Sequence, residues 1–171
     1  MSRQIPSVPD TLVAHIVSQL KFATDDAKKR MIDALIAVDP IIIFNEDKSA
    51  EEDKVYNAVN DMVDDDHLLE SKYAETVKKL DRYKLVDASD DIVDGRFIRW
   101  INLDHPPPCK MTHGGFVVAV DSMEKGDKVV CRNGKRKISF YMKDTLRVFQ
   151  KYTESEWLVL LAKEENPWAF E

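Results

Sequence analysis

His and Cys residues recur at four-residue steps in one segment, as His105, Cys109 and His113. Cys131 could join them from a neighbouring strand, and two His with two Cys would suit tetrahedral zinc. Pro106-Pro107-Pro108 excludes the helix that would align those steps, and Cys-x-x-Cys spacing does not occur. Cys131 is also explained as a small buried residue. We therefore interpret the segment as a loop and expect no metal or other cofactor.

Catalytic and phosphate-binding motifs do not occur in the sequence. The chain has no Gly-x-Ser-x-Gly, no Gly-x-x-x-x-Gly-Lys and no Gly-x-Gly-x-x-Gly. Carboxylates are plentiful, but none stands at a defined spacing within a strand cluster. We expect a protein that is not an enzyme.

The stretch from Lys128 to Phe140 predicts a β-hairpin. Asn133-Gly134 tolerates positive φ at both residues, as a type I′ turn requires, so Arg132 should lie opposite Lys135. Because side chains alternate along a strand, one face of this hairpin should be apolar. It consists of Val129, Cys131, Ile138 and Phe140, with Arg136 at its turn end.

The opposite face of the hairpin is strongly basic and predicts a binding surface. Arginine and lysine would contact phosphates there, and nearby aromatic rings could stack on bases. The candidate binding residues are Arg99, Trp100, Lys128, Arg132, Lys135, Lys137 and Tyr141.

Charge is divided unevenly along the 171 residues, whose formal net charge is −6. Residues 94–151 carry +6, whereas residues 1–93 carry −8 and residues 152–171 carry −4. Two interpretations stay open. The basic block either attracts the acidic parts of the same chain or forms a surface for an outside partner.

The N-terminal part of the chain, residues 1–86, is expected to be helical. Apolar residues at helical spacing in 12–20 and 31–36 predict two helices. Ser49-Ala-Glu-Glu52 is a capping box that opens a long third helix, interrupted by Asp64-Asp65-Asp66. Its apolar stripe, which includes Leu69, Tyr73 and Leu80, should pack either on the chain's own strands or on a partner. An acidic linker, residues 87–95, should follow.

Residues 96–171 predict a small β-barrel with a C-terminal helix. Strands are expected over 96–103, 114–120 and 145–149 in addition to the hairpin, giving five in all. Thr153-Glu-Ser-Glu156 is a second capping box, which opens the C-terminal helix. The predicted class is therefore α+β, an N-terminal helical region followed by an SH3-like barrel.

Composition favours an intracellular protein, cytoplasmic or nuclear. No apolar run is long enough to span a membrane, and the first residues lack the apolar core of a signal peptide. The two cysteines are typical of a reducing compartment.

Three segments together resemble small uncharacterised proteins of large eukaryotic DNA viruses. They are Asp94-Gly-Arg-Phe-Ile-Arg-Trp-Ile101, Gly114-Gly115 with Val117-Val118, and the run from Val148 to Glu156. The resemblance covers residues 94–162 and implies a virion or minor capsid component. It assigns no functional residue.

The function expected from these patterns is protein–protein interaction or assembly. Apolar helices and an aromatic tail would make the contacts, with Trp168 and Phe170 as anchors. The alternative is a nucleic-acid-binding module that uses the basic hairpin face.

Overall fold

The computed structural model describes residues 47–104 and 106–165, together with residues 24, 26, 27 and 30. The chain forms two compact units, of which Glu51–Lys151 makes up nearly all of the first, and the described residues 152–165 and 47–50 belong to the second. The segments 12–20 and 31–36, over which two helices were predicted, and the predicted anchors Trp168 and Phe170 lie outside the described residues. Within the described part, no helix is long and apolar enough to cross a membrane.

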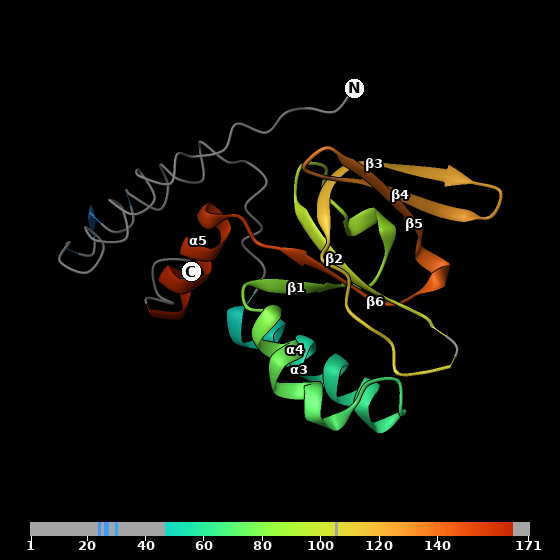
Figure 1. The fold of residues 1–171 in the computed structure, drawn as a ribbon. Helices are drawn as coiled ribbons and strands as arrows, with labels where there is room; N and C mark the ends of the chain where they lie inside the picture. Colours follow the sequence, from blue (N-terminus) through green and yellow to red (C-terminus); the bar gives the residue numbers. More distant parts are fainter. Residues whose placement is uncertain (1–23, 25, 28–29, 31–46, 105, 166–171) are drawn as a thin grey trace. The chain divides into compact units, whose positions relative to one another are not determined.

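The first unit is built on a six-stranded antiparallel sheet with the strand order β1-β6-β2-β3-β4-β5 (Figure 1). This confirms the α+β class, but the sheet is open, with edges at β1 and β5, and is not a closed five-stranded barrel. The strands are β1 (Tyr83–Val86), β2 (Phe97–Asn102), β3 (Gly115–Met123), β4 (Gly126–Asn133), β5 (Arg136–Tyr141) and β6 (Thr145–Lys151).

Strand β1 is the element that the sequence pattern did not predict. Its four residues, Tyr83–Val86, are too few to show a period, and they fall in the segment expected to be helical. Its backbone pairs antiparallel with the C-terminal half of β6, from Tyr83 opposite Lys151 to Val86 opposite Val148. The acidic segment 87–95 then connects β1 to β2 inside the first unit and contains a short 3₁₀ turn, η2 (Ser89–Asp91).

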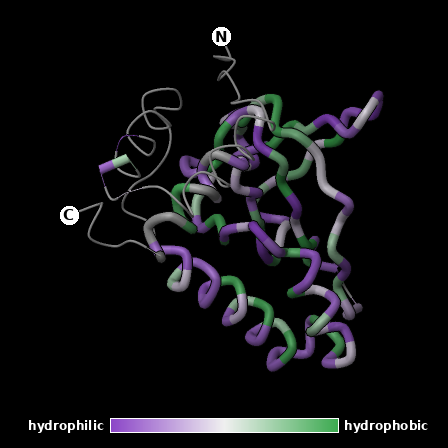
Figure 2. The backbone as a smooth tube through the Cα atoms, turned by 90° about the vertical axis from the view of Figure 1, so that its left-hand side faces the viewer, coloured by the Kyte–Doolittle hydropathy of each residue, from purple (hydrophilic) through white to green (hydrophobic). Residues whose placement is uncertain are grey.

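Two helices and a 3₁₀ turn precede the sheet, α3 (Lys48–Asp64), η1 (Glu70–Lys72) and α4 (Tyr73–Lys79). The expected capping box at Ser49 is wrong, because α3 begins one residue earlier and the backbone N–H of Ser49 donates to the Asp47 carboxylate at 2.9 Å. In Figure 2 the helical part of the chain at the bottom of the view alternates between hydrophobic and hydrophilic residues. Asp66, at φ 59°, lies in the break between the two helices.

The sheet carries a separate hydrophobic cluster on each face. On one face, buried residues of α3 such as Val59 and Met62 pack against Ile101 and Phe149. The other face carries nine buried residues that include Trp100, Val129 and Phe140. The apolar stripe predicted for the long third helix therefore packs mainly against the chain's own sheet.

The second face is concave. Trp100 in β2 stacks on Phe140 in β5 with 4.1 Å between ring centroids, although two strands separate β2 from β5. Such a contact requires the sheet to curl strongly, and a β-bulge at Val118 in β3 and another where β2 meets β6 increase its twist. The face that bears the helices is accordingly convex.

The hairpin of β4 and β5 forms as predicted, but its register differs. Asn133 lies opposite Arg136, so the turn residues are Gly134 and Lys135, with Gly134 at φ 60°. Glycine at the first turn position with positive φ is typical of a type II′ turn, not type I′. The turn lies one residue later than predicted, so β4 gains Asn133 and β5 begins at Arg136 instead of Lys135. Each residue of β4 pairs two residues further along β5, which keeps the alternation, and the apolar face of Val129, Cys131, Ile138 and Phe140 is confirmed.

In the second unit, α5 (Glu154–Glu165) begins at the predicted capping box. The Glu156 N–H donates to Thr153 Oγ1 at 3.2 Å, and the Thr153 N–H donates to Glu156 Oε1 at 3.0 Å. Tyr152, Trp157 and Leu160 form a small buried cluster beside the cap. Lys48 Nζ lies 5.3 Å from the Trp157 ring and 3.4 Å from a Glu164 carboxylate oxygen.

Candidate functional site

The convex face of the sheet continues past the helices onto β3, β4 and β5, where it is exposed and basic. We call this surface the basic face. The strand pairing identifies the residues of this face, because residues directly opposite each other on neighbouring strands point to the same side of the sheet. The basic face comprises Arg99, Phe116, Lys128, Arg132 and Lys137.

Phe116 is the most exposed large apolar residue of this face, with 55% of its surface accessible. It lies directly opposite Arg132 on β4 and opposite Phe97 on β2. The Phe97 and Phe116 rings meet edge to face, 5.1 Å apart at an interplanar angle of 83°. Such a pair fixes the Phe116 ring and leaves at least one of its faces uncovered by Phe97.

The sequence pattern did not identify Phe116, because residues 114–120 have the composition of a buried strand. The structure shows alternation instead, with Gly115 and Val117 buried and Phe116 and Val118 exposed. An unbroken apolar run on an antiparallel strand beside a basic hairpin was the available signal, since one face of such a strand commonly lies toward solvent.

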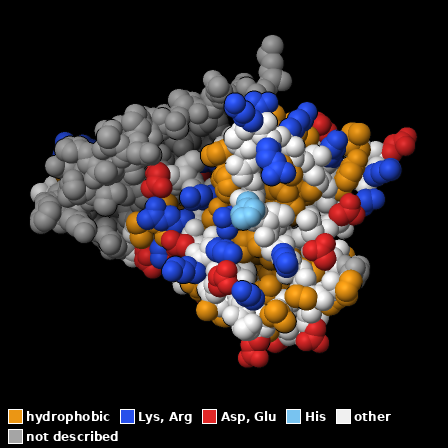
Figure 3. All heavy atoms as spheres, viewed as in Figure 1, with side chains coloured by type: hydrophobic (Ala, Val, Ile, Leu, Met, Phe, Trp, Pro, Cys, Tyr) orange, Lys and Arg blue, Asp and Glu red, His pale blue; other side chains and the backbone are white. Residues whose placement is uncertain are grey.

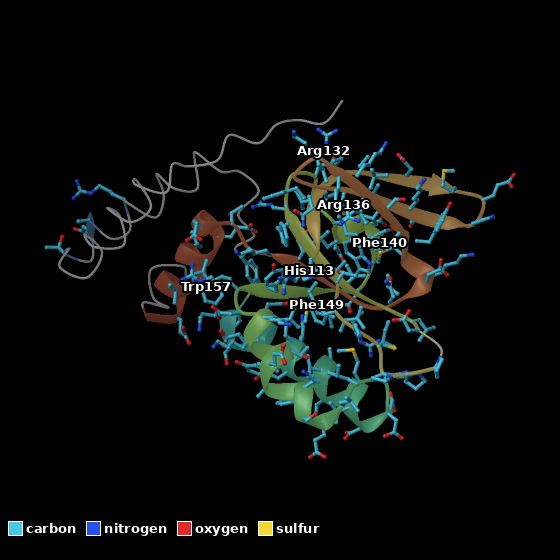
Figure 4. The ribbon with its side chains drawn as sticks, viewed as in Figure 1. His113, Arg132, Arg136, Phe140, Phe149 and Trp157 are labelled. Atoms are coloured by element: carbon cyan, nitrogen blue, oxygen red, sulfur yellow. The ribbon has the colours of Figure 1, made fainter. Side chains whose placement is uncertain are left out.

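Like charges lie opposite each other on the basic face. Arg132 faces Lys137 directly across β4 and β5, an arrangement that destabilises a sheet. Among the residues that the structure describes, neither side chain forms an ion pair with a carboxylate. Figure 3 shows Lys and Arg side chains gathered at the top of this view, and in Figure 4 the labelled Arg132 lies there, above His113.

Arg99 lies in the neighbouring row of the same face, opposite Phe149. A Cβ added at Gly114 would come within 2.9 Å of Arg99 Cγ, so glycine leaves the space through which this side chain runs. Its Nε is buried without a hydrogen-bond partner in the described structure, and its Nη1 contacts Met111 Sδ at 3.9 Å. Burial raises the pKa of the nearby Tyr83 hydroxyl, and the Arg99 charge opposes that rise.

The remaining predicted binding residues do not all reach this surface. Trp100 is 3% exposed and stacks in the concave core, so it is not available for stacking on a ligand. Lys135 occupies the turn, and Tyr141 is half-buried opposite Lys128. Trp100 was predicted as a binding residue, but it follows Arg99 in β2 and so lies on the opposite face of the sheet. There it is buried in the hydrophobic cluster of the concave face.

Acidic residues begin at the other end of the hairpin. Asp121 lies directly opposite Lys128 on the basic face, four residues along β4 from Arg132. Glu124 follows in the exposed β3–β4 turn, and Asp127 accepts hydrogen bonds from Ser89 and Ser122. The positive charge is therefore concentrated at the end of the sheet that holds Arg132 and Lys137.

The candidate zinc ligands are not brought together. Cys109 lies in the cluster under the helices, whereas Cys131 lies in the concave cluster on the opposite face. Burial raises the pKa of the Cys131 thiol to about 12, which keeps it protonated. Across residues 47–104 and 106–165, no group of three or more His, Cys, Asp or Glu could hold a metal ion. His105 lies outside the described residues.

A cleft of about 610 Å³ lies between α3, the end of β1 and the start of β6. Its floor includes Leu85, Val86 and Leu146. Its charged lining mixes both signs and indicates no ligand class: Lys54, Lys143, Arg147, Asp61 and Asp87.

The apolar residues expected to serve assembly are mostly used within the first unit. Leu80 is buried in the cluster under the helices, and Tyr73 is half-buried against it. Leu69 is 51% exposed and stands apart from the basic face, in the segment between α3 and η1.

Comparisons with protein-family models, with curated proteins and with solved structures find no match to this chain.

Proposed function

We propose that the first unit binds nucleic acid through the basic face. The single observation that supports this most is Phe116, an exposed aromatic ring that contacts Phe97, lies directly opposite Arg132 and shares a cross-strand row with Lys137. Aromatic rings stack on bases and basic side chains contact phosphates, and the two occur here on one rigid sheet surface.

The charge arrangement supports the same proposal. Two cations held opposite each other without a carboxylate reduce the stability of the hairpin. A polyanion would remove that repulsion on binding and would release counterions, which supplies most of the affinity of such contacts. If the chain is a virion component, as its resemblance to small viral proteins implies, this surface would meet the packaged genome.

The test is a fluorescence-anisotropy titration of the full chain with labelled single- and double-stranded DNA and RNA at two salt concentrations. We expect micromolar or tighter binding that weakens steeply with salt. Phe116→Ala should weaken binding about tenfold, because a stacked base contributes about 1–3 kcal/mol. Leu69→Ala, which also removes an exposed apolar side chain, is the matched control and should bind like the wild type. Phe116→Trp should restore binding.

Assembly through apolar contacts is the competing proposal, and the same titration separates the two. An assembly protein would bind none of the nucleic acids even at low salt. Its sedimentation coefficient would instead rise with protein concentration, and Trp168→Ala would reduce that rise. Equal binding by wild type and Phe116→Ala would reject the role of the basic face.

A further inference from the structure

The basic face contains a row of side chains that crosses the sheet perpendicular to its strands. Phe97, Phe116, Arg132 and Lys137 lie opposite one another in sequence from β2 to β5. The pairing of Ile98 with Gln150 extends the row by one residue to Lys151 on β6. Beyond Lys151 the row continues to Tyr83 on β1, which is buried in the cluster under the helices. The part of the row outside that cluster therefore has lysine at both ends, with two rings and an arginine between them.

We propose that the ligand of the basic face is a single strand of nucleic acid that crosses the sheet along this row. The inference rests on the proposed function and specifies its ligand and its path. A base can stack on Phe116 only if it is unpaired, so the ring selects single strands over duplex. Lys151 on one side and Arg132 with Lys137 on the other then contact the phosphates that flank this base.

The charges off the row favour this path over the alternative, a strand that follows the hairpin. Movement along β4 from Arg132 leads first to Val130, which is buried, and then to Lys128 with Asp121 opposite it. A phosphate backbone on that path would meet the Asp121 carboxylate and, beyond it, Glu124. The row itself contains no carboxylate, and neither Lys151 nor Lys137 forms an ion pair with any described residue.

The size of the row predicts the length of strand that it binds. Neighbouring strands lie about 4.8 Å apart, so five strands place Lys151 and Lys137 about 19 Å apart along the row. Such a length suits about four nucleotides, at the low end of the sites of single-strand-binding domains.

The experiment measures the salt dependence of binding of the full chain to a labelled oligothymidylate of eight nucleotides. Each phosphate contact with a single strand contributes about −0.7 to the slope of log K against log salt. Lys151→Gln and Lys137→Gln should each make the slope less negative by about 0.7. Lys128→Gln removes the same charge from the same face but off the row, so the crossing path predicts a smaller change of slope there than at Lys151 or Lys137. The affinity of unlabelled competitor oligothymidylates should increase with their length up to about four nucleotides and change little beyond that length.

The outcomes distinguish this inference from the proposed function. A slope of log K against log salt that becomes less negative in Lys128→Gln and stays unchanged in Lys151→Gln would overturn the crossing path. The nucleic-acid strand would then follow the hairpin. Duplex binding as tight as single-strand binding would overturn the preference for single strands while leaving the proposed function standing. Absence of binding to every nucleic acid would reject the proposed function itself. Melting curves of the three variants check that each is folded.

Discussion

Trp100 stacks on Phe140 with ring planes 23° apart, although β3 and β4 separate their strands in the sheet. The contact joins the middle of the sheet to one of its edges across the concave face. It encloses the cluster that includes Val117, Val129 and Cys131 without closing the sheet into a barrel. The curl that brings these two rings together also makes the basic face convex.

The stack should contribute strongly to stability. We expect Trp100→Ala and Phe140→Ala each to lower the free energy of unfolding by about 3–5 kcal/mol, because each leaves a cavity in a closely packed core. The double variant should lose about 1 kcal/mol less than the sum, which is the contribution of the ring pair itself. Urea denaturation of the four proteins measures both quantities. Additive losses would show that the rings fill space without a specific interaction.

Lys137→Glu should raise the free energy of unfolding and lower the affinity for nucleic acid. The substitution places a carboxylate opposite Arg132, and replacing a like-charge pair by an opposite one should raise the free energy of unfolding by about 0.5 kcal/mol. The same charge would repel phosphate, so affinity for nucleic acid should fall. Lys78→Glu, an equal charge change on an exposed helical residue, is the control and should not weaken binding. A Lys137→Glu variant that is less stable, or that binds as well as the wild type, would contradict the account of this pair.

Cys131 should make the fold sensitive to alkaline pH. Its pKa rises from 9.0 to about 12 on burial, so the folded state keeps a proton that the unfolded state loses. This contribution is fully present below pH 9 and is lost as the pH rises from about 9 to 12. The free energy of unfolding should fall by about 1.4 kcal/mol between pH 8 and pH 10 from this thiol alone. Cys131→Ala lacks the thiol, so its curve should be flatter by that amount, as urea titrations at the two pH values would show.

The capping box of α5 should stabilise the helix in the second unit. Thr153→Ala removes the acceptor for the Glu156 N–H and should destabilise the helix by about 1 kcal/mol. Hydrogen exchange of the α5 amides would show faster exchange there, while the amides of β2 and β4 keep their rates. Thr153→Ser retains the hydroxyl and should exchange like the wild type.

Local patterns predicted much of this architecture. The hairpin was recognisable because Gly134 and the alternation of Val129, Cys131, Ile138 and Phe140 are local signals. The turn type was not recognisable, since the same sequence is compatible with a two-residue turn at Asn133-Gly134 and with one at Gly134-Lys135. The cap at Thr153 was recognised from its own four residues. At the start of α3, the Asp47 carboxylate, two residues before Ser49, accepts the hydrogen bond from the Ser49 N–H instead.

Features that depend on distant pairing were not predicted. The four residues of β1 form a strand only because β6 offers them an edge, and Trp100 is buried only because the sheet curls until β5 reaches it. The candidate site shows the same limit. Arg132 and Lys137 were identified from their hairpin, but Phe116 and Lys151 join them through pairing with β4 and β2.

An open sheet has two edges whose backbone groups can recruit another chain, and β5 is the longer of the two. A second copy approaching β5 would bring Arg136 and Lys137 of both molecules together along one new ladder. Natural sheets use lysine on edge strands to prevent such growth. Lys137, which we propose contacts phosphate on the convex face, would thus also disfavour extension of the sheet by a second copy at β5.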